Sequence, residues 1–363
     1  MMKKALKLLL ILFLPVILFA LYTFITTGFF RSIDNTYEGA VTSVNIPGAE
    51  DFAISRSDGF LIISSDDRAG RRDGKQTVNG LYFMDLNDAQ AQPRLIRAQP
   101  DVPLFPHGIS MVQLDSNSYR LLVVNHVTTG TEAVSSMDPN TVHSIEEYRL
   151  TSDGELTHIK THEDTQISSP NDVVAVGADR FYYTNDHGSK TKLGLMLEDY
   201  LGFKRSNVVY FDGVDYKEVA KDIAYANGIN IDADEHVMYV ASPRDMLVKV
   251  YNLNDDGSLD YQVDIDCNSG VDNIELDEDG LIWIGSHPNL LASSAYFAGG
   301  QPYSPSEIIT IDYKSADDYK VSSVFESDGS DMSASTVAIP YKNKVYVGNV
   351  MDDHFIILDR DKL

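Results

Sequence analysis

The chain has 363 residues, with 54 acidic against 29 basic side chains and a formal net charge of −25. A surface this acidic repels phosphate backbones, which excludes nucleic acid as a partner. Cys267 is the only cysteine, so an internal disulfide is excluded. The length allows either two ordinary domains or one large domain built from repeats.

The N-terminus differs in character from the rest of the chain. Three lysines among the first seven residues precede an uncharged run from Leu8 to Phe30. A helix of that length can cross the ~30 Å hydrocarbon layer of a membrane. We therefore predict a transmembrane anchor over residues 1–30, with the lysines cytoplasmic and residues 31–363 extracytoplasmic, that is periplasmic, extracellular or lumenal. The alternative is a cleaved signal peptide, in which case the protein is secreted.

From residue 31 onward, one strand pattern occurs six times. Each repeat has a polar pair, a short apolar strand, a turn rich in Asp, Gly or Asn, and a second apolar strand. The repeats begin at Glu50, His107, Asn171, Asn227, Asp272 and Ser335. Their spacing, roughly 45–65 residues, suits one four-stranded blade of a propeller. We predict that residues 31–363 form an all-β, six-bladed β-propeller; an antiparallel sandwich with coincidental hairpins is the alternative.

The first residue of every repeat is polar, although it leads into an apolar strand. The innermost strands of a propeller line its central channel, so equivalent residues lie at one height around the axis. Buried polar groups cost free energy unless they find partners. Carboxylate and amide oxygens, which calcium prefers, come from Glu50, Asn171, Asn227, Asp272 and its neighbour Asn273. The pattern favours a central calcium ion; a water-filled polar channel is the alternative.

Two repeats have an aspartate at the second position as well, namely Asp51 and Asp172. Neighbouring residues of a strand point to opposite sides, so these carboxylates cannot all bind the ion of the first positions. Together with a backbone carbonyl, for which Ile109 of the neighbouring repeat is a candidate, they could form a deeper site. We predict a second, structural calcium ion there.

Histidines lie close to the predicted channel mouth. His107 occupies a first position, and His126 ends the second strand of the same repeat. One imidazole of such a pair can take a proton from water while the other orients it and passes the proton on. Two structural histidines are the alternative. His187 and His287 end the corresponding strands of other repeats and are candidates for the substrate pocket, whereas the remaining five histidines look like solvent or loop residues.

Taken together, these motifs resemble the paraoxonase/arylesterase family of calcium-dependent lactonases, over residues from about Glu50 to Ile357. The motifs are Gly48-Ala49-Glu50-Asp51, Pro106-His107-Gly108-Ile109, Val124-Asn125-His126, Pro170-Asn171-Asp172, Asn227-Gly228-Ile229, Val271-Asp272-Asn273 and Gly285-Ser286-His287-Pro288. The resemblance implies two calcium ions. The catalytic ion would have the ligands Glu50, Asn171, Asn227, Asp272 and Asn273, and the structural ion would have Asp51, Asp172 and the Ile109 carbonyl. It also implies that His107 and His126 form a base dyad.

The chain departs from the family in two places. Animal members join the ends of the propeller by a disulfide, but here neither end offers a cysteine, so closure must rest on strand pairing. The lid region from Leu193 to Val209 is shorter than the resemblance leads us to expect, although it still has the pattern of an amphipathic helix. In the family such a helix covers the pocket and contacts lipid, so this departure concerns substrate range.

The sequence therefore predicts calcium-dependent hydrolysis of lactones or aryl esters. Calcium would polarise the carbonyl and His107 would activate water, with Asp272 as an alternative base or nucleophile. No Gly-x-Ser-x-Gly motif is present to suggest a serine nucleophile. Ser335 is expected to face the channel and to hydrogen-bond water or a ligand. The alternatives are a non-catalytic, membrane-anchored assembly factor or chaperone, and a related calcium propeller that acts on sugar lactones or phosphotriesters.

Overall fold

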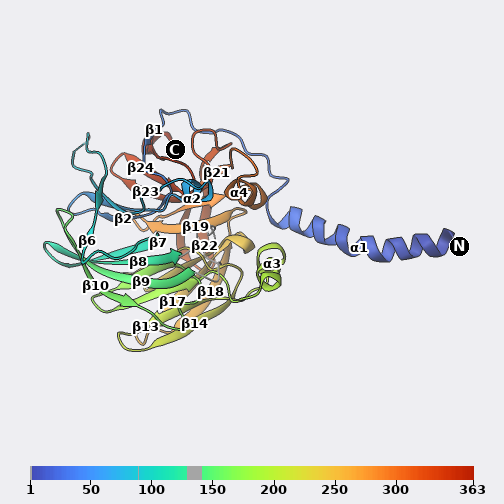
Figure 1. Cartoon of the computed structure of the whole chain (residues 1–363), viewed down its shortest axis with the longest axis horizontal. Helices are drawn as coiled ribbons and strands as arrows, with labels where there is room; N and C mark the ends of the chain where they lie inside the picture. The colour runs from blue at the N-terminus through green and yellow to red at the C-terminus, as the bar shows by residue number, and fades with distance from the viewer. Residues whose placement is uncertain (1, 89, 129–140) are drawn as a thin grey trace.

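The computed structural model describes residues 2–88, 90–128 and 141–363, with side chains from Phe13 onward. Within these residues the strands form six sheets, each drawn mainly from one continuous stretch of chain (Figure 1). The innermost strand of each sheet contacts the innermost strands of the sheets before and after it, including the last with the first. The sheets are therefore blades in a closed ring, and the predicted six-bladed propeller is confirmed.

The blades share an up-and-down antiparallel order, with the first strand of each repeat innermost in its sheet. The first three blades contain β2 (Ala49–Ser55), β3 (Phe60–Ser65), β4 (Gly80–Asp85) and β5 (Arg94–Ile96); β7 (Pro106–Asp115), β8 (Ser118–Thr128), β9 (Thr141–Thr151) and β10 (Leu156–His162), with β6 (Ala98–Gln99) parallel to β10; and β11 (Pro170–Val176), β12 (Arg180–Asn185), β13 (Ser206–Phe211) and β14 (Tyr216–Ile223).

The fourth and fifth blades follow the same plan, and the sixth takes its outermost strand from the other end of the chain. These blades contain β15 (Ile229–Asp232), β16 (Val237–Ser242), β17 (Leu247–Leu253) and β18 (Leu259–Asp266); β19 (Gly270–Leu276), β20 (Ile282–His287), β21 (Ser306–Ser315) and β22 (Asp318–Ser327); and β23 (Ser335–Tyr341), β24 (Lys344–Asn349), β25 (Phe355–Asp359) and β1 (Thr42–Val44).

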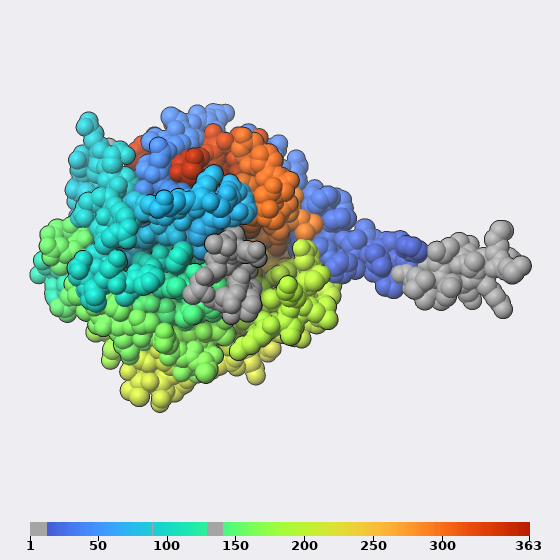
Figure 2. Space-filling model, viewed as in Figure 1, coloured from blue at the N-terminus to red at the C-terminus, as the bar shows by residue number. Residues whose placement is uncertain are grey.

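Closure of the ring depends on β1, which pairs antiparallel with β25 so that Thr42 lies opposite Ile357 and Val44 opposite Phe355. In Figure 2 the blue N-terminal surface accordingly adjoins the red C-terminal surface. Cys267, the only cysteine, is free and buried. The expectation that strand pairing closes the propeller in place of a disulfide is met.

Apolar side chains hold neighbouring blades together. Between the first and second blades, Phe60, Leu121 and Tyr148 belong to one buried cluster. A second cluster joins Tyr182 of the third blade to Met238 of the fourth. Branched and aromatic side chains pack well on the pleated face of a sheet, which explains why the apolar stretches of the repeats form strands.

Three short helices lie near one end of the channel: α2 (Arg68–Arg72), α3 (Lys192–Leu201) and α4 (Leu290–Phe297). Helix α3 begins after Thr191, whose hydroxyl accepts the Gly194 N–H, and ends at Gly202 in a left-handed conformation. The predicted lid helix is therefore present but ends before β13. Its Leu193 and Met196 side chains are 68% and 56% exposed, so part of its apolar face points to solvent.

Helix α1 (Met2–Thr26) precedes the propeller and extends away from the blades (Figure 1). Its C-terminal end contacts α3, where the Tyr22 hydroxyl donates to the Leu201 carbonyl at 3.1 Å. In the described part of the chain, no helix has both the length and the apolar character required to span a membrane. The transmembrane anchor predicted for residues 1–30 is therefore not supported.

Candidate active site

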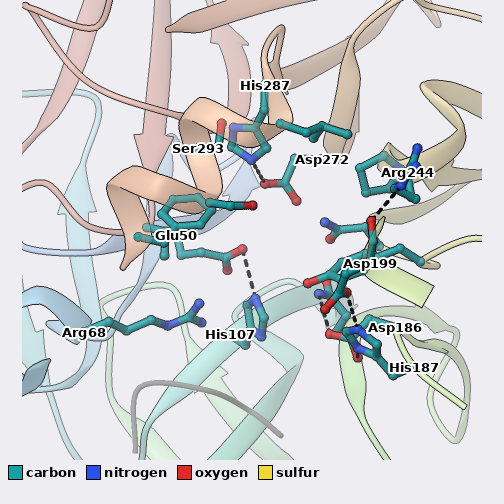
Figure 3. A pocket seen from close by; sticks show the side chains of 18 of the residues that line it. Glu50, Arg68, His107, Asp186, His187, Asp199, Arg244, Asp272, His287 and Ser293 are labelled. Atoms are coloured by element: carbon teal, nitrogen blue, oxygen red, sulfur yellow. Dashed lines mark hydrogen bonds and ion pairs between the residues drawn. The ribbon is translucent and has the colours of Figure 1, made fainter. Parts of the chain in front are cut away.

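A cavity of about 470 Å³ lies where the innermost strands begin. Its walls come from the polar first positions of five repeats and from the three short helices. Figure 3 shows the side chains of Glu50 and His107 from the first two blades, and of Asp272 and His287 from the fifth, converging on it. The ring geometry brings together residues that are far apart in the sequence, as the repeat pattern predicted.

The oxygen-bearing residues at the floor of this cavity are almost completely buried. Their exposed fractions are between 1% and 7%, for Glu50, Asn171, Asn227, Asp272 and Asn273. Four of their oxygens have no hydrogen-bond partner within the described residues: Glu50 Oε2, Asn171 Oδ1, Asn227 Oδ1 and Asn273 Oδ1. All four atoms are acceptors. Buried acceptors that lack donors are costly, but a hard cation satisfies them together.

Hydrogen bonds orient several of these oxygens. The Asn273 amide nitrogen donates to Glu50 Oε1 at 3.2 Å, and the Asn171 amide nitrogen donates to Asp186 Oδ2 at 3.4 Å. With its nitrogen engaged, each amide directs its oxygen elsewhere. In the described chain, no three His, Cys, Asp or Glu side chains form a metal-binding group, so the asparagine oxygens are needed to complete a donor set. That mixed oxygen set suits calcium.

The second positions form a separate layer. Asp51 Oδ2 accepts the Ile109 N–H at 2.7 Å, and Asp172 Oδ2 accepts the Ile229 N–H at 2.8 Å. Burial raises the pKa of both carboxyls well above the usual range, and the charge of Asp172 adds to the effect at Asp51. Two buried carboxyls that repel each other favour either a shared cation or a bound proton. In this layer Ile109 engages Asp51 through its N–H.

Gly108 explains how Asp172 approaches the neighbouring blade so closely. A Cβ atom at Gly108 would lie only 2.4 Å from Asp172 Oδ1 and 2.7 Å from the Asn171 carbonyl oxygen. Any larger residue would therefore push β7 away from β11. The absence of a side chain at Gly108 in the second repeat therefore makes room for Asp172 in the third.

Replacement of Asp172 by alanine should lower thermal stability more than replacement of any first-position residue. The change leaves the buried Ile229 and Val173 N–H groups without their acceptor, at roughly 1–3 kcal/mol each, and it removes a carboxylate of the predicted structural ion. Thermal unfolding at several calcium concentrations measures both effects. Asp172→Asn is the matched control because it keeps an acceptor; if it retains the wild-type calcium dependence of Tm, the structural ion is refuted.

Three histidines form a hydrogen-bonded row beside Glu50. His107 Nε2 lies 3.3 Å from Glu50 Oε1, and His107 Nδ1 lies 3.0 Å from His126 Nε2. His126 Nδ1 in turn lies 2.9 Å from His143 Nδ1. Burial, together with the charges of His107 and His143, holds the pKa of His126 well below its usual value. A proton can therefore pass along the row while His126, the central histidine, stays neutral.

His143 was assigned to solvent or a loop in the sequence analysis, and that assignment is wrong. It lies on β9 directly opposite His126 on β8. The repeat pattern does not give the register in which β8 and β9 pair, so the contact between His126 and His143 could not be predicted.

His187 and His287, the two histidines expected in the substrate pocket, both line the cavity. His287 Nε2 lies 2.9 Å from Asp272 Oδ2. His187 lies between Asp186, at 2.8 Å, and Asp199 of α3, at 2.9 Å. Burial alone would lower the pKa of His187, but the two aspartates raise it to about 10. His187 thus connects the third blade to the lid helix as a cation.

This connection should make stability depend on pH. Because the folded pKa of His187 is above the unfolded value of 6.5, its contribution is complete below pH 6.5 and disappears as the pH rises toward about 10. Wild type should therefore lose roughly 1–3 kcal/mol relative to His187→Gln over that interval. Urea unfolding at pH 6.5 and pH 9.5 checks this, and parallel pH profiles for the two proteins would contradict it.

Ser335 does not reach the cavity. It is fully buried, and its hydroxyl contacts the Ser286 carbonyl at 3.1 Å and the Glu307 carbonyl at 2.9 Å. It also accepts the Glu307 N–H at 3.1 Å. These bonds to the neighbouring blade use the hydroxyl that the sequence analysis expected to bind water or a ligand.

Several cavity residues were not found from the sequence: Arg68, Arg71, Asp186, Asp199, Tyr225 and Arg244. Most of them lie on loops and short helices between the repeats. There the position of a side chain depends on how the chain turns, and the alternation of residues along a strand does not report it. Only Asp186, next to His187 in the Asn-Asp-His motif, carried a usable signal.

Comparison with known proteins agrees with this architecture. A family model described as Arylesterase matches residues 73–356. Serum paraoxonase/arylesterase 2 of Gallus gallus is 34% identical over 275 residues, covering 74% of each chain. Serum paraoxonase/arylesterase 1 of Homo sapiens is 33% identical over 276 residues, with the same coverage.

Solved structures resemble the chain in fold alone. A luciferin-regenerating enzyme aligns with a TM-score of 0.53 at 13% identity, over 88% of this chain and 94% of its own. A gluconolactonase from Xanthomonas campestris aligns with a TM-score of 0.52 at 13% identity, over 90% and 91%. On the family model and the curated relatives, the chain belongs to the paraoxonase/arylesterase family.

Proposed function

We propose that the protein is a calcium-dependent hydrolase of lactones and aryl esters. Membership of the paraoxonase/arylesterase family supports hydrolysis in general terms. The observation that carries the more specific proposal is local. Four buried acceptor oxygens have no donor among the described residues, and they lie at or next to a cavity large enough for a small molecule, which His107 and His126 of the histidine row also line.

Two ions are part of the proposal. Glu50, Asn171, Asn227, Asp272 and Asn273 would hold the ion in the cavity, and Asp51, Asp172 and the backbone carbonyl of Ile109 would hold the deeper one. Support comes from the unpartnered oxygens of the first set and from the mutual repulsion of the two aspartates in the second. A bound calcium ion supplies Lewis-acid stabilisation of the negative charge that develops on a carbonyl oxygen.

The histidine row supplies the base. His107 Nε2 faces the cavity beside Glu50 and accepts a proton from the attacking water, while the Glu50 carboxylate stabilises the resulting imidazolium. The Nδ1 proton of His107 then passes to His126 Nε2, and the Nδ1 proton of His126 passes to His143 Nδ1. His143 is only partly buried, so it can exchange with solvent. Asp272, held by His287, is the alternative base.

A substrate panel tests the proposal directly. Purified protein with calcium should hydrolyse phenyl acetate and δ-valerolactone, with sugar lactones and phosphotriesters included to define the class. Calcium-loaded, folded protein that turns over no member of the panel would refute a hydrolase and favour a non-catalytic assembly role.

We also propose that the propeller acts outside the cytoplasm. The two curated relatives named above are serum proteins by name, and the uncharged N-terminal run agrees with export. Cell fractionation tests the location, and the intact mass of the mature protein distinguishes a retained N-terminus from a cleaved one. Recovery of the folded protein in the cytoplasmic fraction would contradict the proposal.

A further inference from the structure

Two arginines on the cavity wall have no part in the chemistry described above. Arg68 and Arg71 belong to α2, which follows the end of β3 and is capped by the Asp67 side chain. Both line the cavity. Figure 3 shows the Arg68 guanidinium extending toward Glu50 and His107.

Arg68 and Arg71 share a single ion-pair partner, Asp66. Asp66 Oδ2 lies 2.5 Å from Arg71 Nη2 and 3.4 Å from Arg68 Nε. Across the described residues, no other carboxylate forms an ion pair with either arginine, and Asp66 Oδ1 has no hydrogen-bond partner. One aspartate therefore serves as the ion-pair partner of two guanidinium groups at the cavity wall.

The terminal edge of Arg68 is also free to bind. Its side chain is only 15% exposed, yet within the described chain its two terminal nitrogens have no hydrogen bond or ion pair. A guanidinium edge presents two parallel donors whose spacing matches the two oxygens of a carboxylate. Such an edge, held nearly buried beside the reaction centre, is a preformed anion site.

Arg244, which also lines the cavity, is a useful contrast. Its guanidinium donates to the backbone carbonyls of Asp199 at 2.7 Å and Tyr200 at 2.8 Å, and to Thr26 at 3.2 Å. It therefore joins the C-terminal ends of α1 and α3, where a cation is favourable. Arg244 uses its donors within the protein, whereas Arg68 keeps its terminal donors available.

We propose that Arg68, with Arg71 beside it, binds a carboxylate of the substrate, so that the preferred substrates are lactones or esters with a second, anionic group. This inference rests on the proposed hydrolase function and specifies its substrate class. The reacting carbonyl lies over the oxygen cluster formed by Glu50, Asn171 and Asn227. The substrate carboxylate lies against α2, and the cavity volume of about 470 Å³ limits the molecule to a small acid.

The first test compares two matched substrates, γ-butyrolactone and its γ-carboxylate. Wild type should have the higher kcat/KM for the carboxylate, and Arg68→Gln should lower that value by roughly 10- to 100-fold while changing neutral-lactone turnover little. Arg68→Lys keeps the charge but loses the paired donors, so it should recover only part of the preference. Arg94→Gln, on the outer strand β5, is the matched control.

The second test measures binding without turnover. Calorimetry should detect glutarate binding to wild type, weaker binding to Arg68→Gln, and none for neutral glutaramide. If both lactones are hydrolysed equally well and Arg68→Gln changes neither rate, the carboxylate site is refuted and the hydrolase stands. If glutarate binds through Arg68 but no ester or lactone is hydrolysed, the site stands and the proposed reaction fails. Thermal unfolding confirms that the variants are folded.

Discussion

Removal of calcium by a chelator is expected to abolish hydrolysis, with a fall in turnover of at least roughly 100-fold, and added calcium should restore it. Four buried carboxylate and amide oxygens at the cavity floor have no donor among the described residues, and without the proposed cation they would repel one another. Asn227→Ala should reproduce much of the loss at moderate calcium by removing one neutral ligand. Calorimetric calcium titration, together with phenyl acetate turnover, measures both effects.

The matched control is Asn254→Ala, in the β17–β18 turn of the same blade, where the amide bonds only to Ser258 and Asp260 within the described residues. This variant should bind calcium and turn over substrate as wild type does. Asn227→Ala protein with unaltered calcium affinity and unaltered turnover would remove Asn227 from the proposed ligand set. A folded variant that loses activity but keeps its calcium affinity would assign Asn227 to substrate rather than to the ion.

Replacement of His107 by glutamine should lower kcat by roughly 10²-fold or more while calcium binding persists. His107 is the member of the row nearest Glu50 and the cavity, and glutamine cannot accept a proton from water. His158→Gln on β10 is the control, since His158 pairs with Glu146 away from the cavity. Unchanged rates for His107→Gln would exclude the row and leave Asp272 as the base.

The His143→Gln variant distinguishes a proton relay through three histidines from a dyad of His107 and His126 alone. If His143 carries the proton outward, its loss should shift the pH profile of kcat and allow partial rescue by added imidazole, whereas KM should change little. A dyad limited to His107 and His126 predicts no shift and no rescue. The calcium affinity of this variant should equal that of wild type in either case.

The sequence predicted the fold because a propeller repeats itself. Each polar pair marks the start of an innermost strand, and a ring places equivalent starts side by side, so Glu50, Asn171 and Asp272 could be grouped without knowledge of the connecting loops. The positions of residues on the β-strands follow from this repeat. The oxygen cluster and the contact between His107 and His126 both follow from it.

The site residues that the sequence did not predict owe their positions to contacts between blades and to segments outside the regular strands. Arg68 reaches the cavity because β3 is followed by a short helix that turns back over the channel, and no periodic pattern reports such a turn. Ser335 was misplaced because its hydroxyl bonds sideways to Glu307 of the neighbouring blade. The position of His143 depends on the register of β9 against β8, which the repeat pattern does not give. The spacing of the repeats along the sequence does not determine the direction of a side chain or the register of two paired strands.

The pairing of β1 with β25 has a consequence for biosynthesis. The strand at Thr42–Val44 is synthesised long before its partner, Phe355–Asp359. Until then the nascent chain carries an incomplete sheet with unpaired edges, which are prone to association with other chains. The ring can therefore close only after Phe355–Asp359 has been synthesised. A helper that shields the growing edge would increase the yield of folded protein without altering its final stability.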